Sequence, residues 1–127
     1  MKGSDIMRLN DDCVRDILLL IEKSTDNNNL CVDTDFLIHN LTKYTEDEIF
    51  YHIRQIHKYD YVDFVEYADD NPYFIGDLTP LGRNFVDNIR DNKVWSSTKK
   101  IVTKLSSVSL PILSSVAERE LSKFLGL

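Results

Sequence analysis

Five side chains on the outer side of a predicted helix at residues 45–58 have the chemistry to contact nucleic acid. They are Thr45, Tyr51, Arg54, Gln55 and Lys58. Arginine, lysine and glutamine side chains hydrogen-bond to base edges and phosphates, and backbone donors at a capped helix start can hold a phosphate. Glu46 and Asp47 lie beside them and oppose a polyanion. The pattern therefore fits a DNA-contacting surface, a protein-contacting surface or a solvated helix face.

Catalytic and metal-binding patterns do not occur in the sequence. Cys13 and Cys31 have no near partner, and the three histidines lack the four-residue helical spacing that places two imidazoles on one side. No Gly-x-Ser-x-Gly elbow occurs, and the four glycines are too dispersed to form a phosphate-binding loop. We therefore expect no enzyme, no metal site and no cofactor.

Charge is distributed unevenly along the chain. The net charge is −6; residues 1–48 contain eleven acids and five bases, whereas residues 99–127 contain two acids and five bases. Because lysine and arginine supply nearly all non-specific affinity for phosphate, the acidic body disfavours indiscriminate binding to nucleic acid. The basic tail could touch phosphate or could form the solvated side of a helix.

Length and apolar patterning are those of one small soluble domain. The chain has 127 residues, and its longest apolar run, residues 17–21, is far below the roughly 18 residues of a membrane-spanning helix. No basic-then-apolar leader is visible, and isolated cysteines are typical of a reducing compartment. We expect a cytoplasmic protein that does not contact a membrane.

The first third of the chain predicts a helix, a short strand and a second helix. Apolar residues recur at helical spacing behind the capping candidates Asn10, Asp11 and Asp12, which predicts a helix of about four turns. Residues 30–32 predict a short strand. Residues 33–44 fit a short helix or an extended segment, and we favour the helix, started by Asp33 or Asp35.

The middle of the chain predicts a capped helix followed by a hairpin. Thr45 and Glu48 have the spacing of a capping box, so a helix begins there, with isoleucines on its inner side and His52 and His57 on its flanks. Residues 61–78 then alternate as two half-buried strands around an acidic turn at residues 68–72. The side chains expected to point inward are Val62, Phe64, Tyr73 and Ile75.

Three further helices are predicted after the hairpin. Thr79-Pro80 begins the first, and Asp91-Asn92 separates it from the second. Two apolar stripes follow: Val94, Trp95, Thr98, Ile101, Val102 and Leu105, then Leu110, Leu113, Val116, Ala117, Leu121 and Phe124. Because large exposed apolar patches are rare on monomers, we expect residues 92–127 to pack on the preceding domain or to form a homodimer.

A capped helix that feeds a two-stranded hairpin is how winged helix-turn-helix domains present a recognition helix. The sequence therefore predicts an α+β, mostly helical protein. Residues 1–91 would form the winged helix-turn-helix domain, and residues 92–127 would form a C-terminal helical extension.

Several short motifs resemble a known family. They are Val14-Arg15-Asp16-Ile17-Leu18, Glu48-Ile49-Phe50-Tyr51-His52-Ile53, Leu78-Thr79 with Gly82, Phe85, Asp87, Ile89-Arg90-Asp91 and Trp95, then Ser109-Leu110-Pro111 and Leu125-Gly126-Leu127. In combination they are similar to the small family of Firmicutes and phage origin known as domain of unknown function twenty-five thirteen, over nearly the whole chain. The resemblance implies a winged-helix-like fold and a phage or prophage setting, and it implies no chemistry.

The segment from Tyr51 to Ile56 is also similar to the His-Leu-x-x-Leu run in recognition helices of bacterial winged-helix repressors. Those proteins usually continue with Gly-Leu-Ile, whereas Asp60-Tyr61-Val62 stands here. The departure leaves the sharp turn after the helix, and a close approach to DNA, open.

Two functional hypotheses follow from these observations. In the first, the protein is a DNA-associated regulator in which the helix at residues 45–58 reads a groove, Thr45 helps to hold phosphate and a dimer supplies the second half-site. In the second, the same scaffold binds a host or phage protein, for example in host takeover or anti-defence. The acidic turn of the hairpin favours the second hypothesis, whereas the basic tail and the outer side of the helix favour the first. The association of this fold with DNA binding places the first hypothesis slightly ahead.

Overall fold

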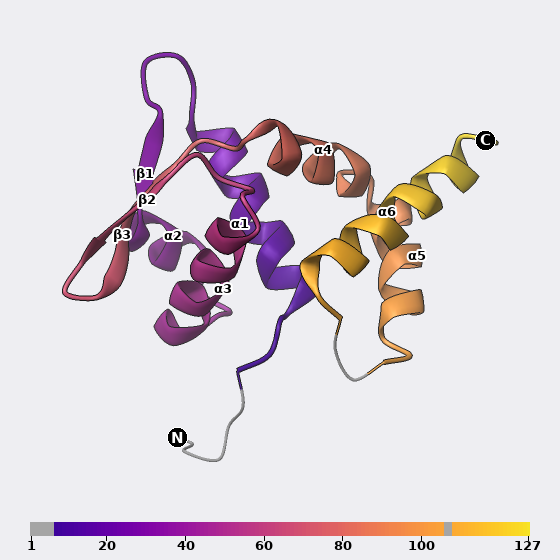
Figure 1. The fold of residues 1–127 in the computed structure, drawn as a ribbon, viewed down its shortest axis with the longest axis horizontal. Helices are drawn as coiled ribbons and strands as arrows, with labels where there is room; N and C mark the ends of the chain where they lie inside the picture. Colours follow the sequence, from indigo (N-terminus) through magenta and orange to yellow (C-terminus); the bar gives the residue numbers. More distant parts are fainter. Residues whose placement is uncertain (1–6, 106–107) are drawn as a thin grey trace.

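The computed structural model describes residues 7–105 and 108–127 (Figure 1). It is an α+β, mostly helical chain with one small antiparallel sheet, as the sequence predicts. In chain order the elements are α1 (Asp11–Ser24), β1 (Cys31–Asp33), α2 (Thr34–Asn40), α3 (Glu46–Lys58), β2 (Val65–Ala68), β3 (Asn71–Gly76), α4 (Pro80–Ile89), α5 (Asn92–Val102) and α6 (Leu110–Phe124).

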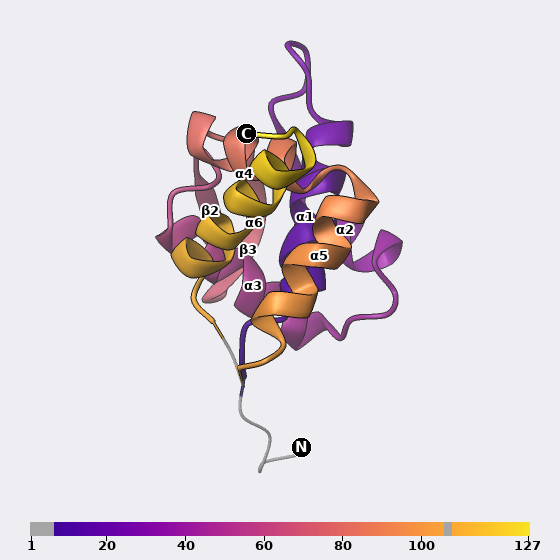
Figure 2. The same ribbon diagram turned by 90° about the vertical axis from the view of Figure 1, so that its right-hand side faces the viewer.

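The molecule is elongated, with the sheet at one end and α5 and α6 at the other (Figure 1). Figure 2 shows α5 and α6 side by side, in front of the rest of the chain. Between the two ends, α1 packs against both α3 and α4. The sheet and the C-terminal helices are therefore held on a common central helix.

Helix starts coincide with the polar residues that the sequence marks as caps. Asn10 accepts the Cys13 N–H at the start of α1, and Asp33 accepts the Phe36 N–H at the start of α2. The short helix expected in residues 33–44 is thereby confirmed, and the strand before it begins one residue later than predicted. Thr45 caps α3 with the expected capping box. Asp91 caps α5 where the sequence predicts an interruption.

The sheet has the strand order β1-β3-β2, and both neighbouring pairs are antiparallel. Val32 pairs with Ile75, and both side chains are buried against the helices. Two side chains that were expected to point inward are instead exposed: Phe64 by 36% and Tyr73 by 45%. The prediction is wrong there because β2 begins only after Phe64, and because the pairing shifts between Glu66 and Tyr67, which breaks strict alternation.

The C-terminal helices bury most of their apolar stripes within the chain itself. Side chains of α5 and α6 that join the central core are Trp95, Val102, Leu110, Leu113 and Ala117. Leu105 and Phe124, also expected inward, are exposed by 61% and 52%. Helix α5 ends at Val102, before Leu105, and the last turn of α6 extends past α5, which carries Phe124 into solvent (Figure 1).

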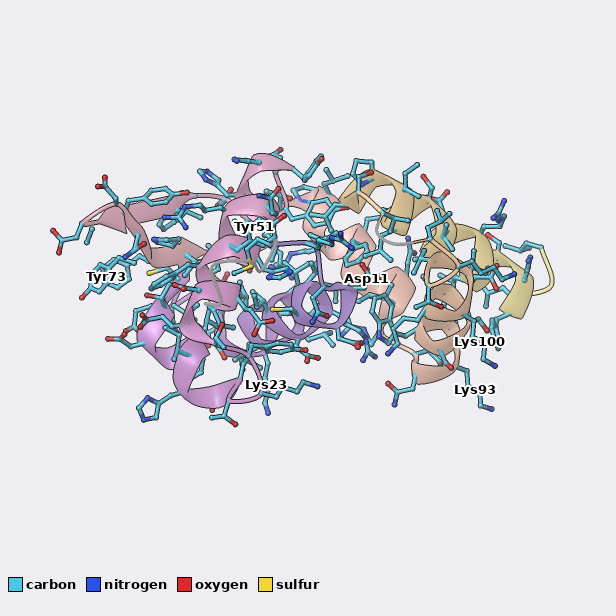
Figure 3. All side chains as sticks on the ribbon, turned by 90° about the horizontal axis from the view of Figure 1, so that it is seen from below. Asp11, Lys23, Tyr51, Tyr73, Lys93 and Lys100 are labelled. Carbon is cyan, nitrogen blue, oxygen red and sulfur yellow. The ribbon has the colours of Figure 1, made fainter. Side chains whose placement is uncertain are left out.

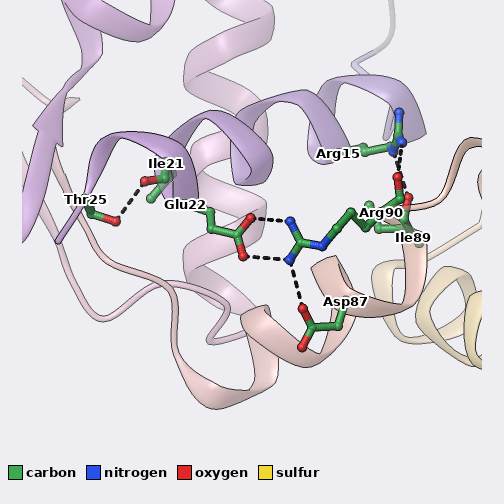
Figure 4. Close-up of polar contacts among 7 residues, drawn as sticks. All are labelled: Arg15, Ile21, Glu22, Thr25, Asp87, Ile89 and Arg90. Carbon is green, nitrogen blue, oxygen red and sulfur yellow. Dashed lines mark hydrogen bonds and ion pairs between the residues drawn. The ribbon is translucent and has the colours of Figure 1, made fainter.

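Two arginines join α1 to the end of α4 (Figure 4). The Arg90 guanidinium donates to both Glu22 oxygens at 2.7 and 2.8 Å and to Asp87 at 2.9 Å. The Arg15 side chain donates to the carbonyl oxygens of Ile89 at 3.0 Å and of Arg90 at 3.1 Å. These carbonyls end a helix and lack intrahelical donors, so Arg15 satisfies them in place of water.

A sharp turn does follow α3, although the glycine usual in repressors is replaced by Asp60. The Tyr61 N–H donates to the Ile56 carbonyl at 3.0 Å and the Asp60 N–H to the His57 carbonyl at 3.0 Å, which is the Schellman pattern. Asp60 has a φ of 64°, in the left-handed region. Aspartate tolerates this region better than most residues, so the turn forms without glycine.

We predict that Asp60→Gly raises the free energy of unfolding by about 0.5–1 kcal/mol, because glycine adopts a positive φ without the Cβ penalty. Urea denaturation monitored by circular dichroism would measure the change. Asp63→Gly, at an exposed position where no positive φ is required, is the matched control and should be neutral or destabilising. A loss of stability in Asp60→Gly would contradict the proposed backbone strain.

Thr79 connects the same turn to α4. Its hydroxyl accepts the Gly82 N–H at 3.0 Å as the helix cap, and it donates to the Asp60 carbonyl at 2.6 Å. Capping alone predicts that Thr79→Ala lowers the free energy of unfolding by about 1 kcal/mol, and the second bond raises the expected loss to about 2 kcal/mol. Thermal and urea unfolding of Thr79→Ala and Thr79→Ser would test this, since serine retains both bonds. Equal stability of wild type and Thr79→Ala would mean that neither bond contributes.

Candidate functional surface

Helix α3 presents the residues that the sequence singles out. Its inner side is made of buried isoleucines: Ile49, Ile53 and Ile56. His52, expected on the flank, belongs to this inner side instead and is only 1% exposed. The flank prediction fails because the backbone of Asn10, just before α1, contacts the imidazole, and a helical wheel cannot show a contact with a distant segment.

Both ring nitrogens of His52 are bonded to backbone groups. Nδ1 lies 2.7 Å from the Glu48 carbonyl and donates to it, and Nε2 accepts the Asn10 N–H at 2.8 Å. Only the neutral imidazole with its proton on Nδ1 satisfies both bonds. Burial lowers the pKa of His52, against a smaller upward effect of the Glu48 carbonyl. His52 therefore acts as a neutral link between α3 and the start of α1.

Thr45 is fully engaged in its own capping box. Its hydroxyl accepts the Glu48 N–H at 3.1 Å, and its backbone N–H donates to the Glu48 carboxylate at 2.9 Å. Three acids, Glu46, Asp47 and Glu48, occupy the first turn. They complement the helix dipole and oppose a phosphate at the same place.

Arg54 points to the hairpin rather than outward. Its guanidinium donates to the Asp70 carbonyl at 2.6 Å and contacts the Asn71 side-chain oxygen at 3.3 Å, and it lies 6.0 Å from the centre of the Tyr67 ring. Asp69 and Asp70 form the tip of the hairpin, both with positive φ. Arg54, which the sequence predicts to contact a ligand, therefore holds the hairpin against α3.

Tyr51 and Gln55 line a hollow of about 340 Å³ on the outer side of α3. The hollow is also bordered by residues 7–9, which precede α1, and by residues 108–110 at the start of α6. The lining residues are Met7, Arg8, Leu9, Tyr51, Gln55, Tyr59, Val108, Ser109 and Leu110. Tyr59 was missed in the sequence, although its spacing of four from Gln55 could have indicated it.

The structure brings two of the five predicted residues together at the hollow and gives the others different surroundings. Lys58 is exposed at the end of α3, Arg54 is bonded to the hairpin, Thr45 is bonded within its cap, and Tyr51 and Gln55 share the hollow. Figure 3 shows Tyr51 in the middle of the molecule, between Tyr73 at the sheet end and Lys93 at the other.

A second group of polar residues lies between α1 and α5. The Trp95 indole donates to Asp12 at 2.9 Å, and the Lys99 ammonium lies 3.1 Å from the same carboxylate. Burial acts to raise the pKa of Asp12, but these two hydrogen bonds and the charges of Lys99 and Lys43 together outweigh it and lower this pKa. Burial, with Asp12 beside it, raises the pKa of Asp11 to about 6. The group fastens α5 to the start of α1.

Other chemistry is limited in the described residues. Cys13 is buried, which raises the pKa of its thiol to about 12, whereas Cys31 is partly exposed. Within residues 7–105 and 108–127, no three histidine, cysteine, aspartate or glutamate side chains converge as metal ligands would. No helix in these ranges has the length and apolarity needed to cross a membrane.

Comparison with known proteins places the chain in a family. The model of the family described as "Hypothetical protein (DUF2513)" matches residues 8–109. The chain belongs to this family. The match confirms the resemblance noted in the motifs, and it extends from the segment before α1 to the cap of α6.

This DUF2513 chain is also similar to a protein of Haemophilus influenzae. The two are 25% identical over 123 residues, which covers 94% of this chain and 100% of the relative, whose name is "Uncharacterized protein". No solved structure matches the DUF2513 chain.

Proposed function

We propose that this protein is a winged-helix interaction module that binds another protein through the hollow on the outer side of α3. The winged-helix assignment is supported by α3 and the β2–β3 hairpin that follows it directly, with β1 pairing on the far side of β3. The observation that carries the function is the hollow of about 340 Å³ lined by Tyr51, Gln55 and Tyr59.

The lining of this hollow fits an apolar side chain of a protein partner. Two tyrosines offer large, rigid ring surfaces, and Leu9, Val108 and Leu110 supply aliphatic walls. Tyrosines in pockets are typical anchors of protein interfaces, because they bury much apolar area and keep a hydroxyl for hydrogen bonding. Gln55 adds a donor and an acceptor that could fix the register of a bound backbone.

Electrostatics disfavour phosphate at the same place. The first turn of α3 carries three acids, and the hairpin tip beside the helix carries Asp69 and Asp70. Arg54 neutralises part of this tip, which leaves Lys58 as the exposed base of the helix. Because affinity for DNA depends on the number of phosphates neutralised by lysine and arginine, Lys58 on the helix and Arg8 at the hollow supply only a weak attraction.

A DNA-associated regulator of phage type is the second candidate. It is favoured by the helix-then-hairpin order, by Lys58 on the outer side of α3, and by the basic residues of α5, which include Lys93, Lys99 and Lys100. A homodimer through residues 92–127 would supply two half-sites and stays a prediction. Light scattering at tens of micromolar protein would measure the oligomeric state.

The two candidates make opposite predictions for Tyr51 and Lys58. A partner captured from a bacterial lysate would be identified by mass spectrometry, purified, and titrated by calorimetry against wild type and Tyr51→Ala. We expect Tyr51→Ala to weaken binding by about tenfold or more, because truncating an interface anchor costs 1–2 kcal/mol or more. Leu81→Ala, which removes an exposed apolar side chain from α4, is the matched control and should bind as wild type does.

Selection from a random DNA pool at low salt tests the second candidate with the same proteins. Enrichment of one sequence, with binding lost in Lys58→Glu, retained in Tyr51→Ala and weakened by salt, would favour the regulator and contradict our proposal. A purified partner that binds Tyr51→Ala as tightly as wild type would also contradict it.

A further inference from the structure

Charge is segregated between the two ends of the molecule. Residues 26–42 and 60–79, which form α2, the sheet and the loops around them, contain three and six acids respectively and no lysine or arginine. Residues 92–110, at the opposite end, contain four lysines and no acid. Two arginines from neighbouring helices reach the sheet end, and both are already bonded: Arg83 to Asp77 at 2.7 Å and Arg54 to the hairpin tip.

One face of the sheet is turned away from the core. Alternation along the strands places Val32 and Ile75 on the inner side, where they are buried. The residues between them form the opposite side, which we call the outer face: Cys31, Asp33, Phe64, Glu66, Phe74 and Gly76. The pairs Cys31–Gly76, Asp33–Phe74 and Glu66–Phe74 are directly opposite each other across the strands. The outer face is therefore a row of aromatic rings bordered by carboxylates.

Aromatic surface on this face is open to solvent. Phe64 is 36% exposed, with its ring against Gly76, where an added Cβ would lie 2.6 Å from the ring. Phe36 of α2 is 38% exposed. Phe36, Phe74 and Cys31 line a hollow of about 390 Å³ whose charged lining residue is Asp33. The hollow is large enough for a medium-sized side chain.

We propose that the outer face docks a lysine- or arginine-rich extended segment of another protein, with an apolar side chain of that segment in the hollow between Phe36 and Phe74. Lysine and arginine stems can lie along the rings while their charged ends reach Asp33 and Glu66. The surplus of acids supplies attraction and orientation, and the hollow supplies the anchor.

Charge identifies this class of partner. Nucleic acid and anionic lipid surfaces are disfavoured by a face that carries Asp33 and Glu66 and belongs to segments with nine acids and no lysine or arginine. The basic helix of the same chain cannot fold back onto the face, because Tyr73 at the sheet end and Lys93 on α5 lie at opposite ends of the molecule (Figure 3). This surface is separate from the hollow on α3 and does not depend on the function proposed there.

The two cysteines provide an internal reporter for the test. Cys31 lines the hollow, whereas Cys13 is buried and its thiol pKa is raised to about 12, so a maleimide should label Cys31. The probe is a peptide of alternating lysine and leucine, added to the full chain at low ionic strength. We expect the peptide to slow labelling of Cys31 by about tenfold at saturation. Fluorescence anisotropy should give a micromolar dissociation constant for the peptide.

Three comparisons decide the outcome. Glu66→Lys and Phe74→Ala should each lower the affinity for the peptide by about tenfold. Glu118→Lys, which makes the same charge change on the distant α6, should lower this affinity by less than about twofold. Replacing leucine by serine, or lysine by glutamate, in the peptide should abolish protection of Cys31. Circular dichroism of each variant checks that it is folded.

Several results would overturn the proposal. Absence of Cys31 protection, or equal binding of the lysine–serine peptide, would reduce the face to a non-specific acidic surface. Unchanged binding in Phe74→Ala would remove the hollow from the site. Concentration-dependent self-association that Glu66→Lys abolishes would identify a second copy of this chain, through its basic end, as the occupant instead.

Discussion

Gly82→Ala should be among the most destabilising single substitutions in this protein, with a loss of about 3 kcal/mol in the free energy of unfolding. A Cβ at this position would lie 2.1 Å from the Tyr61 carbonyl oxygen. That oxygen belongs to backbone and also accepts the Thr79 N–H at 3.1 Å, so it cannot move without breaking the turn before α4. Urea denaturation at neutral pH would measure the loss.

Gly76→Ala is the matched control for this substitution. Its added Cβ would also approach a neighbour closely, at 2.6 Å, but that neighbour is the Phe64 ring, a partly exposed side chain that can rotate away. We therefore expect Gly76→Ala to cost about 1 kcal/mol or less. If both variants lost similar free energies of unfolding, the Tyr61 backbone beside Gly82 would be able to move to accommodate the added Cβ.

His52→Phe should lower the free energy of unfolding by about 2–3 kcal/mol at pH 7, because it leaves the buried Asn10 N–H without an acceptor. His52→Gln, which can still offer an acceptor, should lose less. The variant should also change how stability depends on pH. Unfolding by urea between pH 5 and about 7.5 would test both effects.

The direction of the pH effect follows from the lowered pKa of His52. In the unfolded chain this imidazole binds a proton below its ordinary pKa of 6.5, while the folded chain resists protonation. The unfolded state then binds more protons, so the stabilisation is complete above pH 6.5 and is lost as the pH falls below it, by at most about 1.4 kcal/mol per pH unit. Asp11, with its pKa raised to about 6, acts in the opposite sense, but its contribution cancels in the difference between wild type and His52→Phe. An identical pH profile for both proteins would contradict the assignment of a neutral His52.

Local features of the fold could be predicted from the sequence because short-range chemistry determines them. Thr45 and Glu48 predict the start of α3, and Thr79-Pro80 predicts the start of α4, since a cap involves residues only three apart. The turn at Asp60 could not be predicted from local sequence because the preference of aspartate for a left-handed backbone is weak. The turn also involves a hydrogen bond from the Thr79 hydroxyl to the Asp60 carbonyl, and these two residues lie 19 positions apart in the sequence.

The candidate surface was harder to predict for the same reason. Tyr51, Arg54 and Lys58 share one side of a helical wheel, but contacts from distant segments separate them. Arg54 is bonded to the hairpin 16 residues later, and Tyr51 shares the hollow with residues 7–9 and 108–110. No periodicity in α3 contains these partners. Assembly of the tail from Trp95 onward likewise depends on an indole bond to Asp12, 83 residues earlier.

The passage of the N-terminal segment over α3 bears on how the protein should be handled in the laboratory. Met7 and Leu9 border the hollow that contains Tyr51, and His52 fixes the backbone at Asn10 just beyond them. A bulky label attached to Met7 would lie beside Tyr51 and compete with any partner there. Labels should therefore be attached near Leu127, which lies beyond α6 at the far end of the molecule (Figure 1).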